Sequence, residues 1–123
     1  MGNRAVITTA EKKLGVYLHW NGGRDSVEGF LEYCKRAGFR SPDTDCYGWA
    51  RLCQVIANFF GPGGTSVGID LYERLDTEGD NGVYVIEGWE IVGREFEPEK
   101  EQRTSPLEDF VKAVADKQPQ VKP

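Results

Sequence analysis

Apolar and polar residues alternate along residues 14–20, and a period of two is typical of a half-buried strand. Residues 4–9 are rich in strand-favouring types, and the polar stretch 10–13 separates the two segments. We therefore expect a hairpin of two strands near the N-terminus. On the second strand, one side carries Leu14, Val16, Leu18 and Trp20, and the other side carries Tyr17 and His19.

Further along the chain the apolar spacing changes to three and four residues, which indicates helices. The first helix has Asp25 as its expected N-cap, with Glu28 reaching back to it, and Gly38 as its left-handed end. A second helix is expected to begin at Ser41-Pro42 and to end near Phe60. The apolar faces are Val27, Phe30, Leu31 and Cys34 in the first helix, and Trp49, Leu52, Cys53, Ile56 and Phe60 in the second.

The remaining segments predict two stretches of strand and one more helix. Strand is expected over residues 66–73 and, in two pieces, over residues 83–97. A capping box at Ser105–Glu108 opens a short last helix, and residues 118–123 are expected to form a frayed tail. Because strands and helices come in runs, we predict an α+β fold: a mainly antiparallel sheet with two central helices and a short C-terminal helix, in a single domain over residues 1–117.

Charge and composition restrict the partners. The chain has 123 residues, with 15 Lys and Arg against 20 Asp and Glu, and a formal net charge of −5. An acidic chain of this kind is a poor candidate for binding duplex nucleic acid over a broad surface, although a small anion could still be held in a local basic pocket. The apolar runs are much shorter than the roughly 20 residues that span a membrane, and we expect no membrane partner.

The residues that usually carry catalysis are scarce. His19 is the only imidazole, which excludes sites built on two histidines, and the chain has no Gly-x-Ser-x-Gly motif. Cys34, Cys46 and Cys53 lack the spacing of metal ligands, and we expect them to be small buried thiols in a reducing cytosol. The sequence therefore predicts a protein that is not an enzyme and that carries neither a metal nor a cofactor.

The strongest local signal for binding is the loop Asn21-Gly22-Gly23-Arg24, where a strand ends and a helix begins. Free amides at a helix N-terminus bind anions, and an adjacent Arg offers a charged fork for phosphate. The same two glycines would also suit any tight turn, and Asp25 would compete with an anion for the amides. Both interpretations stay open at this point.

Other candidate residues come from a second small-residue loop, from aromatic residues near loops and from the cations near element ends. A purine stacks well on aromatic rings, and Arg binds phosphate. The full set of candidate ligand-binding residues is Tyr17, His19, Asn21, Gly22, Gly23, Arg24, Tyr47, Arg51, Gly63, Gly64, Thr65 and Arg94.

Four stretches of the chain, Met1–Thr8, Tyr17–Gly23, Tyr47–Arg51 and Gly88–Arg94, resemble small phage-borne proteins. The likeness is to the first of the two types of Thoeris anti-defence sponge and extends over most of the chain. Such a resemblance implies a protein of the bacterial host cytoplasm that catalyses nothing. It also implies a homo-oligomer that sequesters cyclic ADP-ribose isomers made by bacterial TIR-domain enzymes, and in some members cyclic trinucleotides as well.

Two other functions remain as alternatives. The acidic clusters at Asp76–Asp80 and Glu95–Glu101 could mimic a phosphate backbone, as in an acidic inhibitor of a defence nuclease of the anti-CRISPR or anti-restriction kind. A small metabolic or toxin–antitoxin enzyme would have to use His19. We rank the sponge first, on the loop from Trp20 to Asp25 together with the resemblance. We expect its sites at or near subunit boundaries, because pockets between subunits would let a small chain enclose such a ligand.

Overall fold

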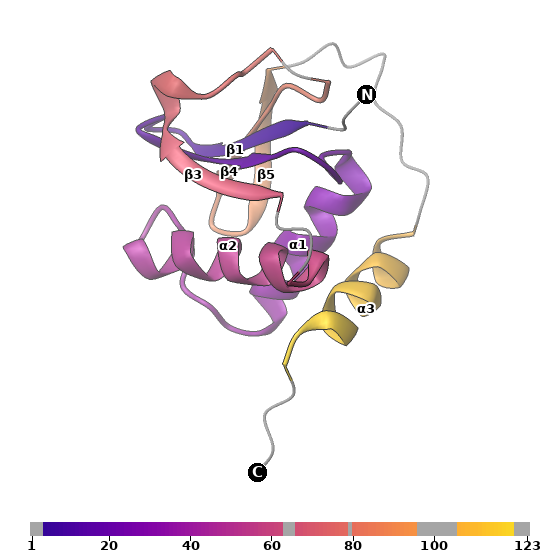
Figure 1. The fold of residues 1–123 in the computed structure, drawn as a ribbon. Coiled ribbons are helices and arrows are strands. Elements are labelled where there is room, and N and C mark those ends of the chain that lie inside the picture. The colour runs from indigo at the N-terminus through magenta and orange to yellow at the C-terminus, as the bar shows by residue number, and fades with distance from the viewer. Residues whose placement is uncertain (1–3, 63–65, 79, 96–105, 120–123) are drawn as a thin grey trace.

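Five strands form one sheet in the computed structural model, which describes residues 4–62, 66–78, 80–95 and 106–119 (Figure 1). The strands lie in the order β3-β2-β1-β4-β5. Neighbouring strands are antiparallel except for β1 and β4, which are parallel. Their bounds are β1 Ala5–Thr9, β2 Leu14–Leu18, β3 Val67–Leu71, β4 Val83–Glu87 and β5 Glu90–Glu95. The expected N-terminal hairpin and the mainly antiparallel sheet are confirmed.

The helices of the described chain lie on one side of the sheet (Figure 1). The first two, α1 and α2, pack beneath the strands, and α3 packs against both of them. Their bounds are α1 Arg24–Arg36, α2 Cys46–Phe60 and α3 Leu107–Lys117, and a 3₁₀ turn, η1, spans Tyr72–Arg74. The α+β fold with two central helices and a short C-terminal helix is therefore confirmed.

The core lies between the sheet and the helices. Alternate residues of the strands and the apolar faces of the helices meet there, and each fully buried large side chain contributes about 1.5–3 kcal/mol of hydrophobic stabilisation. The fully buried side chains of this layer include Ile7, Val16, Leu18, Tyr84 and Ile86 from the sheet and Val27, Phe30, Leu31, Leu52, Val55 and Ile56 from the helices.

Both central helices begin at residues other than those expected. The N-cap of α1 is Gly23, whose carbonyl accepts from the Val27 amide, and the carboxylate of Asp25 instead accepts from the Ser26 amide. In α2 the N-cap is Asp45, whose carboxylate accepts from the Tyr47 amide at 2.9 Å. The start predicted at Ser41-Pro42 is wrong because these residues form a turn: the Ser41 carbonyl accepts from the Asp45 amide.

The ends of two strands also differ from the prediction. Strand β2 stops at Leu18, so that His19 and Trp20 lie beyond it, and Trp20 is 44% exposed instead of buried. Strand β3 stops at Leu71, because the chain turns into η1 immediately afterwards. The cap predicted at Ser105 lies outside the described residues, and α3 begins after Pro106.

The C-terminal helix is held by a residue that was expected to fray. Gln118 is buried, and its side chain accepts from the Asn58 amide at 2.9 Å and donates to the Val55 carbonyl at 2.9 Å. Because this buried amide both accepts and donates a hydrogen bond, it stabilises the contact between α2 and the end of α3. Gln118 therefore packs with the domain, and residues 120–123 of the predicted tail lie outside the described residues.

The three thiols have different surroundings. Cys34 is buried, and burial raises its pKa to about 12, as expected for an unreactive core thiol. Cys46 is exposed at the start of α2, which contradicts its expected burial, and Cys53 is intermediate. Within the described ranges no group of three or more potential metal ligands forms. In the same part of the chain, none of the helices combines the length and apolar character that crossing a membrane requires.

Candidate functional site

The predicted binding residues occupy three separate places in the structure. Tyr47 and Arg51 line a hollow at the start of α2. Gly22, Arg24 and Arg94 surround a buried tyrosine beneath the loop that precedes α1. Two further aromatic candidates, Tyr17 and His19, line a hollow beside β3. The other candidates are Asn21, whose amide donates to Ser26 Oγ, and Gly23, the N-cap of α1, whereas Gly63, Gly64 and Thr65 lie outside the described residues.

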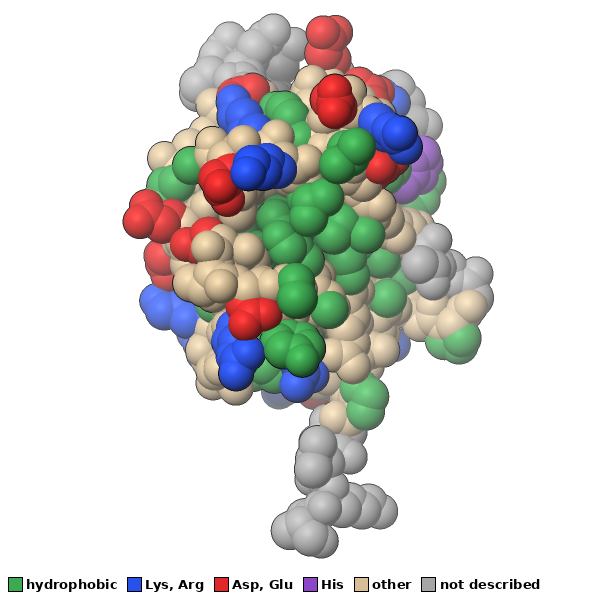
Figure 2. All heavy atoms as spheres, turned by 90° about the vertical axis from the view of Figure 1, so that its left-hand side faces the viewer, with side chains coloured by type: hydrophobic (Ala, Val, Ile, Leu, Met, Phe, Trp, Pro, Cys, Tyr) green, Lys and Arg blue, Asp and Glu red, His purple; other side chains and the backbone are tan. Residues whose placement is uncertain are grey.

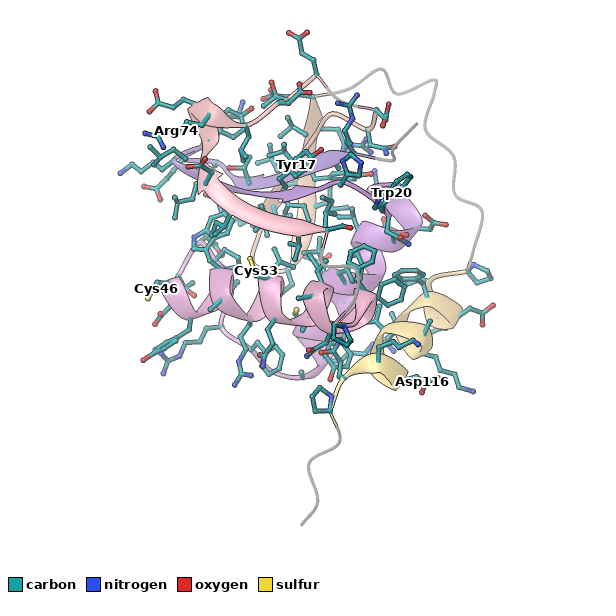
Figure 3. The ribbon with its side chains drawn as sticks, viewed as in Figure 1. Tyr17, Trp20, Cys46, Cys53, Arg74 and Asp116 are labelled. Atoms are coloured by element: carbon teal, nitrogen blue, oxygen red, sulfur yellow. The ribbon has the colours of Figure 1, made fainter. Side chains whose placement is uncertain are left out.

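The first hollow has a volume of about 360 Å³ and lies where the end of α1 meets the start of α2. Cys46, the first residue of α2, marks this end of the molecule in Figure 3. Tyr47 and Arg51 are four residues apart on α2, so they share one face of the helix. The residues that line the hollow are Gly38, Phe39, Arg40, Tyr47 and Arg51.

Each arginine of this hollow lies over an aromatic ring. The guanidinium carbon of Arg51 is 4.3 Å from the centroid of the Phe39 ring, and that of Arg40 is 5.4 Å from the centroid of the Tyr47 ring. Stacking of this kind holds a guanidinium in place while leaving its N–H groups to bind an acceptor. The Tyr47 side chain is 62% exposed, and Arg40 is exposed as well. The hollow therefore presents two oriented cations and one open aromatic face.

One carboxylate, that of Asp45, already neutralises part of the positive charge of the two arginines. Asp45 Oδ2 accepts from Arg40 at 2.9 Å. The backbone bond from Tyr47, followed by the bond from Arg40, holds the pKa of Asp45 below its usual value, so Asp45 stays ionised at neutral pH. Arg51 donates to the neutral Gln54 side chain at 3.0 Å. The local charge of the two arginines and Asp45 together is thus positive.

The turn between β4 and β5 fixes the segment that carries Phe39 and Arg40. The indole of Trp89 donates to the Phe39 carbonyl at 2.9 Å, and the Gly88 amide donates to Asp43 Oδ1 at 3.1 Å. The hydroxyl of Ser41 also donates to Asp43, and these bonds lower the pKa of that carboxyl. The hollow is therefore built on backbone that two bonds from the β4–β5 turn hold in position.

The second place is a network within the fold around Tyr84, which no sequence argument singled out. Its hydroxyl donates to the Gly22 carbonyl at 2.7 Å, and the Arg94 guanidinium carbon lies 3.8 Å from its ring centroid. Arg94 also donates to the Asn81 carbonyl, and Arg24 donates to Glu28 at 2.7 Å. These contacts connect β5 with the loop Asn21–Arg24, which we call the glycine loop. They also engage Arg24 and Arg94, the two arginines that were expected to bind a phosphate.

Replacing Tyr84 with Phe removes the bond to the Gly22 carbonyl and is expected to lower the free energy of unfolding by about 1 kcal/mol. Burial raises the pKa of Tyr84 to about 12. The unfolded phenol ionises near pH 10, so this residue's contribution is complete below pH 10 and is lost as the pH rises toward 12. Urea titrations from pH 8 to 11 should show a steeper loss of stability in the parent than in the Phe variant; parallel curves would contradict this assignment.

The third place is a hollow of about 390 Å³ lined by Tyr17, His19, Ser66, Val67 and Gly68. The Tyr17 hydroxyl lies 3.0 Å from His19 Nδ1, and the His19 ring meets the Trp20 ring edge-on with centroids 5.0 Å apart. His19 is exposed and has no carboxylate among the partners that the structure gives it, so no Ser-His-Asp or Cys-His arrangement surrounds it in the described chain.

Comparison with known proteins adds no relative. No family model, curated protein or solved structure matches the chain. The choice among the three places therefore rests on their geometry. Two arginines line the hollow of the first place, whereas no arginine is among the residues that line the third.

Three residues of the first hollow were missing from the predicted set, namely Gly38, Phe39 and Arg40. An aromatic residue and an arginine directly after Gly38, which was correctly expected to end α1 with a positive φ, were a usable signal. Their approach to Tyr47 depends on the turn at residues 41–45, whose shape local pattern does not reveal. Trp89, whose indole donates to the Phe39 carbonyl, lies 50 residues later in the sequence.

Proposed function

We propose that this protein binds cyclic adenine nucleotides and holds them without chemical change, acting as a phage-encoded sponge for bacterial immune signals. The observation that carries the proposal is the hollow in which Arg40 and Arg51 each lie over an aromatic ring. The resemblance of the chain to Thoeris anti-defence sponges supports the same ligand class and a site of action in the bacterial host cytoplasm.

The chemistry of the hollow suits a nucleotide. A guanidinium binds a phosphate through two parallel N–H···O bonds, and these charge-assisted bonds are among the strongest in proteins. The exposed face of Tyr47 can stack on a purine, because every base has a flat π surface. The five lining residues hold no imidazole, carboxylate or thiol, which fits a protein that binds its ligand without hydrolysing it.

Affinity arithmetic favours a site completed by a second copy of the chain. A sponge that competes with a receptor needs nanomolar binding, about −12 kcal/mol. Two charge-assisted arginine bonds and one stacked base supply about 4–9 kcal/mol. We therefore propose a homo-oligomer whose neighbouring subunit supplies the remaining contacts.

The surface carries exposed apolar side chains that such an assembly could bury. Edge strand β3 exposes Ile69 and Leu71, of which Ile69 is 48% exposed, and Val92 is exposed on β5. Figure 2 shows apolar side chains gathered into a band down the middle of one face, with charged side chains above and below it. Exposed apolar bands of this kind often mark contacts between proteins.

The alternative of an acidic nuclease inhibitor has less support. Arg4 lies 3.3 Å from Asp76 and 3.4 Å from Asp80, so one cation of the chain compensates part of the first acidic cluster. Glu95, the described residue of the second cluster, is paired with Lys12. A phosphate mimic needs its carboxylates open to a basic partner. The proposal of a nucleotide sponge is therefore preferred.

The test is a calorimetric titration of the purified protein with cyclic ADP-ribose isomers, with native mass spectrometry for stoichiometry. Arg51→Ala and Arg40→Ala are each expected to weaken binding about 10- to 150-fold, because each removes a charge-assisted bond to phosphate. Arg74→Ala removes an exposed arginine outside the hollow and should leave affinity unchanged. Arg24→Ala, which acts on the glycine loop, should change affinity much less than Arg51→Ala.

Three outcomes would contradict the proposal. The first is that no cyclised adenine nucleotide binds the full-length protein. The second is binding that does not depend on Arg40 or Arg51. The third is recovery of a hydrolysed product after heat release of the bound ligand, because a sponge returns its ligand intact and an enzyme does not.

A further inference from the structure

The geometry points to a second binding site, separate from the arginine hollow, that takes an uncharged heteroaromatic ring of the nucleobase type. This site is the hollow lined by Tyr17, His19, Ser66, Val67 and Gly68, which we call the ring site. The Trp20 ring meets that of His19 at its border. Figure 3 shows Trp20 on the opposite side of the molecule from Cys46, which marks the arginine hollow.

Three aromatic side chains close together in sequence contact one another here: Tyr17 and His19 line the ring site, and Trp20 meets His19. The Tyr17 hydroxyl is fixed 3.0 Å from His19 Nδ1, and the His19 and Trp20 rings are T-shaped with an interplanar angle of 86°. The end of β2 therefore holds the Tyr17 and His19 side chains toward each other. Such mutual contacts restrict rotamers in advance, which lowers the entropy lost when a flat ligand binds.

The exposure of Trp20 is unusual within this chain. Trp49 and Trp89 are at most 9% exposed, whereas Trp20 is 44% exposed. One exposed apolar residue needs no explanation. Trp20 differs from such a residue because its indole contacts the exposed His19 ring beside the hollow, where it offers ring surface to a bound ligand.

The hollow is open because Gly68 has no side chain, and the fold does not require glycine there. Gly68 is the β3 residue directly opposite Tyr17, and a Cβ atom placed on it would meet nothing within 4 Å. Its φ is not positive. Glycine weakens a strand and often marks a place where a ligand approaches closely. Here it leaves the space beside Tyr17 unfilled.

The lining residues determine the class of ligand. None of the five is Lys, Arg, Asp or Glu, and Arg4, a cation near Tyr17, is already paired with Asp76 and Asp80. It offers ring faces for stacking, and His19 Nε2, which the bond between Tyr17 and Nδ1 leaves available, can exchange a hydrogen bond with the polar edge of a base. An uncharged nucleobase combines a flat π face with such an edge.

Adenosine is the probe, because it carries a base and no phosphate. Binding to the full-length protein is measured by calorimetry in the presence of excess inorganic pyrophosphate, and in parallel by quenching of tryptophan fluorescence. We expect saturable binding with quenching of the exposed Trp20. Trp20→Ala should weaken binding about 5- to 150-fold, the range found for removal of a stacking residue. Trp20→Phe should keep most of the affinity and lose the quenching.

Gly68→Val adds two methyl groups beside Tyr17 from a Cβ position that meets nothing within 4 Å, and it is expected to weaken adenosine binding at least tenfold while leaving the melting temperature unchanged or raised. Gly93→Ala is the matched control, since Gly93 lies on the other edge strand and an added Cβ would meet only ordinary contacts with Val85. Arg74→Ala, which removes an exposed arginine that lines neither hollow, should leave adenosine binding unchanged.

The inference is overturned if adenosine does not bind, if Gly68→Val binds it as well as the parent does, or if a methyl glucoside displaces it with equal affinity. Adenosine binding that is lost in Arg51→Ala and kept in Gly68→Val would place the base in the arginine hollow. That result would end this inference and leave the proposed function standing, so the two ideas fail separately.

Discussion

Replacing Gly48 with Ala is expected to lower the free energy of unfolding by about 3 kcal/mol, near the upper end of overpacking effects. A Cβ atom on Gly48 would lie 2.2 Å from the Ser41 carbonyl carbon and 2.3 Å from the Pro42 nitrogen. Both are backbone atoms, and the Ser41 carbonyl is held by bonds from the Thr44 and Asp45 amides. The turn at residues 41–45 therefore cannot move away from the added Cβ atom without losing those bonds.

The same change should also weaken nucleotide binding, because the displaced turn connects Arg40 to α2. Urea denaturation measures the stability, and calorimetry measures the affinity. Gly68→Ala serves as the control, since the added Cβ meets nothing within 4 Å, and its stability should stay within about 0.5 kcal/mol of the parent or rise. A Gly48→Ala variant as stable as that control would show that α2 and the turn do not approach so closely.

Replacing Phe30 with Ala is expected to cost about 4 kcal/mol, within the range for a fully buried aromatic residue. Its side chain is fully buried, and its ring meets those of Phe59 and Phe110 edge-on, with centroids 5.4 and 5.5 Å away. Such pairs add to the stabilisation from burial alone. Phe110 belongs to α3, so the cavity would weaken the attachment of that helix first.

Hydrogen exchange locates the effect of Phe30→Ala. Amides of residues 107–117 should lose more protection than those of β1, because α3 packs on the other helices and makes no ladder bonds with the sheet. Phe60→Ala is the matched control: its ring contacts Phe59 but is only partly buried, and the loss should be smaller. Equal losses for the two variants would contradict the packing described for the helical layer.

The sequence predicts those parts of the fold that depend on local spacing. The period of two over residues 14–20 and the helical spacing after residue 24 come from one face of each element being buried. Gly38 follows α1 with a positive φ, and α2 ends at Phe60, both as expected. Helix starts were less predictable. Asp25 is a good N-cap type, yet the chain already has helical bonds from Gly23 onward.

The candidate site was predictable only in part, for a related reason. Tyr47 and Arg51 are one helical turn apart, which the sequence reveals directly. Arg40 reaches them through a turn that Trp89 anchors from the β4–β5 connection, and no local pattern contains that contact. The sequence presents Arg24 and Arg94 as candidate phosphate-binding residues, and the fold engages Arg24 with Glu28 and places Arg94 over Tyr84.

The parallel pairing of β1 with β4 has a consequence for synthesis of the chain. Strand β1 is the central strand, and the partner of Val6 is Val83. A nascent chain can form the N-terminal hairpin early, but β1 keeps one edge unpaired until β4 has left the ribosome. Truncated products that end before β4 would therefore carry an open strand edge and be prone to aggregate.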